Sequence, residues 1–148
     1  MAIQIRRATE ADAVEAISTL RSSITELCVA DHHNDPAEVE GWLGNKTVVT
    51  WQKWIARDDA LVLVAERDSE VVGVGMANLS GVILLNYVHP DARYSGVSKA
   101  ILTAIERALR AQGVQHCRVE STITAQSFYE SCGFRPETGN ALVLSKPL

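Results

Sequence analysis

The sequence of 148 residues lacks several features that would assign it to a particular class of protein. It contains no apolar run approaching the ~18 residues that a membrane-spanning helix needs. The first residues, Met-Ala-Ile-Gln-Ile-Arg-Arg, lack the apolar h-region of a secretory signal peptide. Its 3 cysteines are an odd number without zinc-type spacing. We therefore expect a cytoplasmic protein with neither a membrane span nor a bound metal.

Positive charge is also sparse. The chain has 14 Lys and Arg against 18 Asp and Glu, a formal net charge of −4, with no basic block or stripe. Nucleic-acid binding therefore has little support, whereas the mild acidity is compatible with a cationic amine substrate. Apolar residues make up 47% of the chain, and its length suffices for one domain with a sizeable core.

The hydrophobic periodicity predicts one α/β domain over residues 1–148, with the element order β-α-α-β-β-β-α-β-α-β. Glycines make the middle of the stretch Pro36–Arg57, the second expected helix, uncertain. The strand–helix–strand unit around residues 97–111 should place its two strands parallel, which makes the sheet mixed. The expected strands are Ala2–Ala8, Ala60–Glu66, Val71–Leu79, Val82–Val88, Gln115–Ser121 and Ala141–Leu144; the expected helices follow the N-cap Thr9 and cover about Pro36–Arg57, 97–111 and Thr124–Cys132.

The segment 86–98 has the pattern of an anion-binding site. A strand stops at Pro90, a short turn contains Gly96, and a helix with apolar residues at Ile101, Ile105 and Leu109 follows. The first N–H groups of a helix lack internal partners, and the helix dipole favours negative charge there. An ordinary β–α loop, whose glycine serves only the turn, is the alternative.

A second motif lies in Ala125–Phe134, Ala-Gln-Ser-Phe-Tyr-Glu-Ser-Cys-Gly-Phe. Alone, it is also compatible with a short helix that fills the core with its phenylalanines. Together the two motifs resemble the GNAT acetyltransferase superfamily. That family has Val-x-Pro, then Gln/Arg-x-x-Gly-x-Gly/Ala, and about 30 residues later Ala-x-x-(aromatic or aliphatic)-Tyr-x-x-x-Gly-Phe. The resemblance is strong over Val82–Pro136 and consistent in element order over Ile3–Leu79.

The resemblance implies a GNAT fold, with a mixed, mostly antiparallel sheet whose strands 4 and 5 splay apart around acetyl-CoA. Backbone amides of 94–99 would hold the pyrophosphate. The pantetheine arm would pair with Asn86–Val88, where a backbone N–H would serve as oxyanion donor. Tyr129 would assist the departing thiolate, unless it is a packed tyrosine with a structural hydroxyl. The expected cofactor-binding residues are Asn86, Tyr87, Val88, Arg93, Tyr94, Ser95, Gly96, Val97, Ser98, Lys99 and Thr122.

The chain departs from the family pattern at three places. Ser98 stands where Gly or Ala is usual, and Thr122 stands where many members have Asn. The strand Val82–Val88 has no carboxylate, which leaves the general base open. Glu120 is a candidate base, because strand alternation places it on the same face as Thr122.

Other sources of a base stay open as well. Asp31, His32 and His33 lie in a region that often borders the acceptor site in this family, and proton loss through a water chain is an equal alternative. Trp42 is read as a core residue or as a wall of the acceptor pocket. Cys117 and Cys132 are read as small buried residues, because no histidine partner is identifiable.

The expected function is direct acetyl transfer from acetyl-CoA to a primary amine, on a small molecule or on a protein. A non-catalytic acyl-CoA sensor or interaction module of the same fold is the alternative, and an acyl donor other than acetyl is a further one. A homodimer is plausible through edge strands or through the Trp-bearing second helical stretch. Gly73-Val74-Gly75 has no helix after it and is therefore expected to serve close packing or a bulge rather than a dinucleotide.

Overall fold

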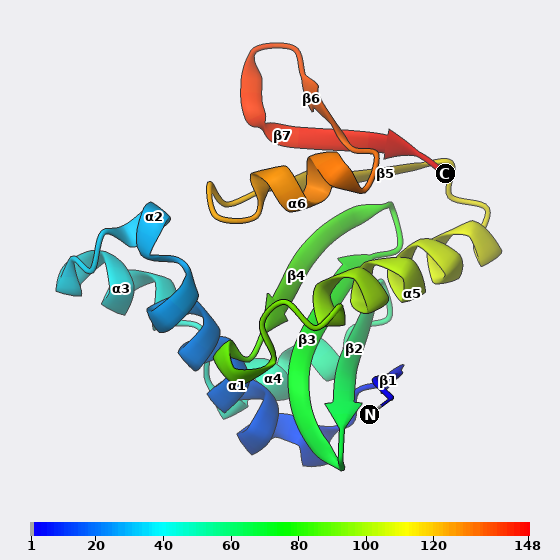
Figure 1. Cartoon of the computed structure of the whole chain (residues 1–148). Coiled ribbons are helices and arrows are strands. Elements are labelled where there is room, and N and C mark those ends of the chain that lie inside the picture. Colours follow the sequence, from blue (N-terminus) through cyan, green and yellow to red (C-terminus); the bar gives the residue numbers. More distant parts are fainter. Residues whose placement is uncertain (1) are drawn as a thin grey trace.

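The computed structural model describes residues 2–148, whose strands form one seven-stranded sheet in the order β1-β2-β3-β4-β5-β7-β6 (Figure 1). β4 and β5 are parallel and the other neighbours are antiparallel, which confirms the mixed, mostly antiparallel sheet. The strands are β1 (Gln4–Arg7), β2 (Ala60–Arg67), β3 (Glu70–Asn78), β4 (Val82–Val88), β5 (His116–Glu120), β6 (Arg135–Glu137) and β7 (Asn140–Pro147). The helices are η1 (Glu10–Asp12), α1 (Ala13–Leu27), α2 (Val29–His32), α3 (Pro36–Leu43), α4 (Val48–Ile55), η2 (Pro90–Ala92), α5 (Val97–Ala111) and α6 (Gln126–Ser131).

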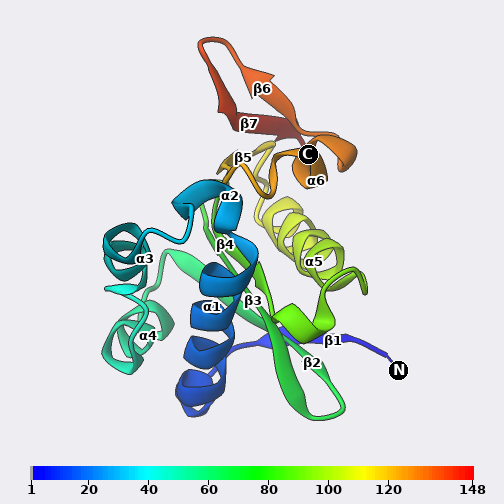
Figure 2. The same cartoon turned by 60° about the vertical axis from the view of Figure 1, so that its left-hand side comes forward.

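Helices cover both faces of the central strands, as Figure 2 shows. α1 packs on β3 and β4 from one side, and α5 packs on β2, β3 and β4 from the other. The apolar residues of α5 recur at helical spacing, so that one stripe of the helix is buried. Each face has its own core, one containing Leu20, Trp51 and Met76 and the other containing Ile101, Ile105 and Phe134.

The two strand glycines allow α5 to approach β3 closely. A Cβ added at Gly73 would lie 2.6 Å from Val97 Cγ1, and one added at Gly75 would collide with Ile101 Cγ2. The expected role in close packing is therefore confirmed.

The stretch expected as a second helix is two helices, α3 and α4, separated by the segment 44–47. Asp35 caps α3 by accepting from Ala37 N at 3.3 Å. Thr47 caps α4 by accepting from Thr50 N at 3.2 Å. The expectation of one helix over about Pro36–Arg57 is corrected at this point, because a new N-cap begins a new helix.

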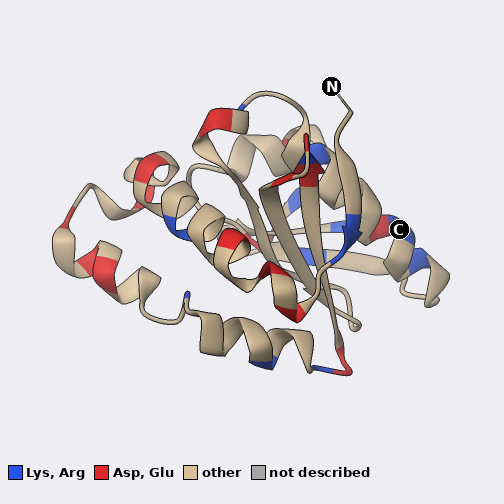
Figure 3. Cartoon of the chain, turned by 90° about the horizontal axis from the view of Figure 1, so that it is seen from below, with Lys and Arg blue, Asp and Glu red and all other residues tan. Residues whose placement is uncertain are grey.

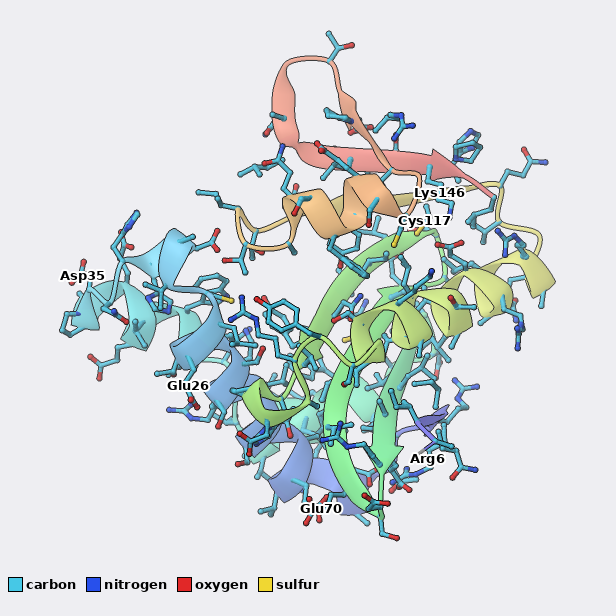
Figure 4. All side chains as sticks on the ribbon, in the orientation of Figure 1. Arg6, Glu26, Asp35, Glu70, Cys117 and Lys146 are labelled. Carbon is cyan, nitrogen blue, oxygen red and sulfur yellow. The ribbon has the colours of Figure 1, made fainter. Side chains whose placement is uncertain are left out.

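The C-terminal hairpin is also larger than expected. β7 extends well beyond the predicted strand Ala141–Leu144, and it pairs with the unpredicted β6. Lys146 of β7 donates to Glu106 of α5 at 2.9 and 3.1 Å, an ion pair whose carboxylate is buried. Cys117 of β5 is the direct strand partner of Lys146, and Figure 4 labels both. This ion pair connects the hairpin to the central layers.

Among the described residues, 2–148, the parallel strands β4 and β5 pair only at the N-terminal end of β4, against Arg118 and Val119 near the end of β5. Their paired residues are Val82 with Arg118 and Ile83 with Val119. Within residues 2–148, the rest of β4 has no partner on β5, so the two strands diverge toward Val88 and Glu120. The expected splay is present, and it opens the sheet between two layers of helices.

The surface carries both charge signs. Acidic and basic positions are interspersed along the helices and strands in Figure 3. Across residues 2–148, no helix combines the length and apolar character needed to cross a bilayer.

Candidate active site

A cleft of about 780 Å³ opens where β4 and β5 diverge. Four segments line it: the end of α1, the end of β4, the loop and first turn of α5, and the region of α6. The lining residues are Leu27, Cys28, Asn86, Tyr87, Val88, Ala92, Arg93, Tyr94, Gly96, Val97, Ser98, Lys99, Thr122, Thr124, Ala125, Ser127, Phe128, Tyr129 and Ser131. All expected cofactor-binding residues belong to this set except Ser95, whose hydroxyl donates to the Ala92 carbonyl.

The first turn of α5 forms one wall of the cleft and presents backbone donors. Gly96 is the N-cap, with φ of 86°, and its carbonyl accepts the first helical hydrogen bond from Ala100 N at 3.0 Å. A Cβ at Gly96 would meet nothing within 4 Å, so the backbone is open there. The first turn contains no acidic residue. Free amides at a helix N-terminus make this wall suited to an anion such as a pyrophosphate.

The loop before α5 adds positive charge and a strained residue. The Arg93 guanidinium lies 4.6 Å from the centre of the Tyr94 ring. Tyr94 itself has φ of 64°, the left-handed conformation that costs a side-chain-bearing residue about 1 kcal/mol or more. The strain is typical of backbone that is shaped for ligand contact.

Asn86 of β4 is bonded to the wall that the first turn of α5 forms. Its Nδ2 donates to Ser98 O at 3.2 Å, which fixes the orientation of the amide. Its Oδ1 is buried and accepts no hydrogen bond from any of residues 2–148. A buried acceptor without a donor is costly, and an amide N–H of a pantetheine arm is a suitable donor. The unpaired edge of β4 beside it fits the same extended arm.

Tyr129 of α6 faces this cleft from a packed position. It is 4% exposed. Its ring is edge-on to Phe128 and Phe134, with ring centres 5.1 and 5.4 Å apart. Burial raises the pKa of Tyr129 above its usual value, and a contact with the Asn86 side chain lowers it less. The hydroxyl is therefore protonated at neutral pH and available as a donor.

Glu120 lies apart from the main cleft. It is the exposed last residue of β5 and lines a small cavity of about 50 Å³ between β4 and β5, together with Asn86 and Tyr129. Thr122, the other residue of the alternation argument, lies beyond the strand and accepts from Ala125 N at 3.1 Å. The assignment of Glu120 as base stays a prediction.

The other candidates for the base lie in α2 and at its C-cap rather than in a loop, and they have other contacts. Asp31 accepts from Ile123 N at 2.6 Å and from the Thr124 hydroxyl at 2.6 Å. His32 is 1% exposed and has both ring nitrogens engaged, Nε2 with Ile24 O and Nδ1 with Asn34 N. These contacts disfavour Asp31 and His32 as proton acceptors. His33 is exposed, in a left-handed conformation.

Cys28 lines the cleft, and its burial disfavours the reactive thiolate. Burial raises the pKa of Cys28 to about 11 and that of Cys117 to about 12. The reactive form of a cysteine is the thiolate, so neither thiol is activated. No group of three or more His, Cys, Asp or Glu in the described chain is arranged to hold a metal ion.

Sequence reasoning missed several residues of the cleft. Leu27 and Cys28 reach it from the end of α1, and Thr124 and Ser127 reach it from the α6 region. Ser127 lies inside the second motif, Ala125–Phe134, but no local motif marks Leu27, Cys28 or Thr124. The fold alone brings the end of α1 to the split. Trp42 packs edge-on against His32 at 6.1 Å and is not among the residues that line the main cleft.

The family follows from a comparison with known proteins. Residues 28–143 match the family model described as an acetyltransferase (GNAT) domain. The chain belongs to the GNAT acetyltransferase family. It is therefore an acyltransferase, and the resemblance in the two motifs is confirmed.

Solved structures with the same fold include GNAT proteins in complex with coenzyme A or acetyl-CoA. The PaiA N-acetyltransferase from Thermoplasma acidophilum, in complex with coenzyme A, is 22% identical with a TM-score of 0.86, and the match covers 100% of both chains. A GCN5-related N-acetyltransferase from Rhodopseudomonas palustris is 21% identical with a TM-score of 0.86, covering 100% of this chain and 99% of that one. A GNAT acetyltransferase from Brucella melitensis, in complex with acetyl-CoA, is 17% identical with a TM-score of 0.68, covering 99% and 88%.

Proposed function

We propose that this GNAT protein transfers an acetyl group from acetyl-CoA directly to a primary amine. One observation carries the proposal. A single cleft combines the free amides at the start of α5, the unpaired edge of β4 and the buried hydroxyl of Tyr129. These are the groups that an anion, an extended pantetheine arm and a departing thiolate require.

Acetyl-CoA would supply the activated acetyl thioester. The amides of Val97, Ser98 and Lys99 would bind its pyrophosphate, with Arg93 and the helix dipole adding favourable charge. Asn86 Oδ1 would accept a hydrogen bond from the pantetheine arm, and the backbone of β4 would donate hydrogen bonds to the arm and accept them from it. The orphaned Asn86 oxygen and the open backbone at Gly96 support this placement.

The chain would then contribute to transfer at two atoms. A backbone N–H near Asn86–Val88 would stabilise the negative charge that develops on the thioester oxygen. The Tyr129 hydroxyl would donate a hydrogen bond to the sulfur as it departs. Full proton transfer from a tyrosine to a thiolate is uphill by about 2 kcal/mol at reference pKa values, and the raised pKa of Tyr129 increases this difference. Tyr129 therefore acts as a hydrogen-bond donor rather than as a full acid.

The acceptor would enter as a neutral amine. A lysine-like amine has a reference pKa of about 10.4, so a proton must leave before attack. Glu120, in the cavity between the splayed strands, or a chain of water would take that proton. The acceptor class would be a small amine or a protein amino group.

We also propose that residues 1–148 act as one catalytic domain in the cytoplasm. The full-length structural match to the Thermoplasma protein supports the domain assignment. The unpaired Cys28, Cys117 and Cys132 are compatible with a reducing compartment.

A thiol-release assay tests the proposal. Purified protein is incubated with acetyl-CoA and a panel of polyamines, amino acids, aminoglycosides and lysine peptides, with acetyl-CoA alone as control. We expect amine-dependent CoA release and an acetylated amine detectable by mass spectrometry. Tight CoA binding without release across the panel would instead favour a non-catalytic acyl-CoA-binding module.

A further inference from the structure

One carboxylate joins the two sides of the cleft. Asp31 of α2 accepts from Ile123 N at 2.6 Å through Oδ1, and from Thr124 N at 3.2 Å and Thr124 Oγ1 at 2.6 Å through Oδ2. These groups are more than 90 residues away in the sequence. Both oxygens of Asp31 are therefore engaged by a segment that the chain reaches only by folding.

The segment that Asp31 holds leads directly into α6. Residues 122–125 form a turn before the helix, and the N-cap Ala125 makes no side-chain hydrogen bond to α6. The Asp31 carboxylate satisfies the exposed amides of this turn from the other side of the cleft. Charged acceptors make the stronger class of hydrogen bond, so the turn has a fixed place relative to α2.

The position of this contact matters because the sheet does not hold the two sides together here. β4 and β5 pair only near Val82 and Ile83, at the opposite end of the split. Asp31 makes three hydrogen bonds to the segment 121–134. Among residues 2–148, these are the only hydrogen bonds that join α1 or α2 to that segment. That segment carries Tyr129, and the α1 side carries Leu27 and Cys28 of the same cleft.

We propose that Asp31 is a positioning residue for the transfer reaction, which fixes the turn before α6 and thereby the distance of the Tyr129 hydroxyl from β4. The inference rests on the proposed function. Asp31 acts through Thr124 and Ile123, and it neither contacts the thioester nor accepts the proton of the amine. Displacement of a catalytic group by about 1 Å can cost up to about 100-fold in rate, so loss of this contact is expected to be visible in kcat.

The test compares Asp31→Asn with Thr124→Val and a matched control. The control is Asp35→Asn. It removes a nearby carboxylate that does not contact α6, and asparagine can still cap α3. We expect Asp31→Asn to lower kcat about 10-fold with KM for acetyl-CoA within about twofold of the wild type, since the phosphate wall is untouched. Thr124→Val should lower kcat by a smaller factor, the double variant should be no worse than Asp31→Asn, and Asp35→Asn should match the wild type.

A Tyr129→Phe background shows whether Asp31 acts through Tyr129. We expect Asp31→Asn to lower kcat less than about threefold there, because the group it positions is gone. An equal loss in both backgrounds, or an unchanged kcat in folded Asp31→Asn protein, would overturn the proposal and leave the transferase function intact. Thermal melts and amide exchange at Ile123 and Thr124 establish that each variant folds and that the contact is broken. A wild type that binds CoA but acetylates no amine would overturn the transferase function, and the positioning role with it.

Discussion

Replacement of Tyr129 by phenylalanine isolates the hydroxyl that the proposed chemistry needs. The ring is 4% exposed and packs against Phe128 and Phe134, so phenylalanine fills the same space. We expect kcat to fall about 100-fold, which corresponds to ~2.7 kcal/mol of lost transition-state stabilisation. The KM for acetyl-CoA and the melting temperature should change little, because the ring and the phosphate wall remain.

The leaving group provides a second readout for the same variant. An acetyl donor whose thiol is more acidic than CoA needs less hydrogen-bond stabilisation as the sulfur departs. The loss of kcat in Tyr129→Phe should therefore be smaller with such a donor.

The pH profile of the rate gives a third readout. Burial raises the pKa of Tyr129, so the wild-type rate should show no alkaline fall due to this group below about pH 10. The reasoning is refuted if folded Tyr129→Phe protein has the kcat of the wild type.

Three further predictions concern backbone shape, a buried ion pair and a buried thiol. Gly96→Ala and Gly113→Ala both force alanine to φ above 80° in open space, so each should lower the free energy of urea unfolding by about 1 kcal/mol. Only Gly96→Ala should raise KM for acetyl-CoA, by about 10-fold. Lys146→Met leaves the carboxylate of Glu106 buried without its closest cation and should lower the unfolding free energy by about 3 kcal/mol, most of which Glu106→Leu restores in the double variant. Burial raises the pKa of Cys117 to about 12, so iodoacetamide at pH 8 should alkylate it only after denaturation, as mass spectrometry would show; rapid labelling of the native thiol would contradict this.

The sequence predicted the strand, turn and helix on one side of the cleft well because their signals are local. The strand before Pro90, the turn at Gly96 and the helix after it each depend on neighbouring residues only. The observed α5 runs from Val97 to Ala111, as its apolar spacing predicts, and Gly113 after it has the positive φ expected of a helix-terminating glycine. Tyr129 lies at the cleft, as its compact motif predicts, and its role in the chemistry stays a prediction.

Features that depend on distant partners were beyond such reasoning. Nothing in the sequence near Asp31 indicates that it meets Thr124, because only the closure of the sheet brings them together. The strand β6 contains Pro136 and has no strand-like pattern of its own. It is a strand because it pairs with β7. Glycines made the middle of the stretch Pro36–Arg57 uncertain as a helix, but the new cap at Thr47 became clear only in the fold.

A crystal structure with CoA bound would test the central claim most directly. We expect a pyrophosphate within hydrogen-bond distance of the amides of Val97, Ser98 and Lys99, a pantetheine arm along β4, and the sulfur facing the Tyr129 hydroxyl. CoA bound outside the split between β4 and β5, or a sulfur remote from Tyr129, would contradict it.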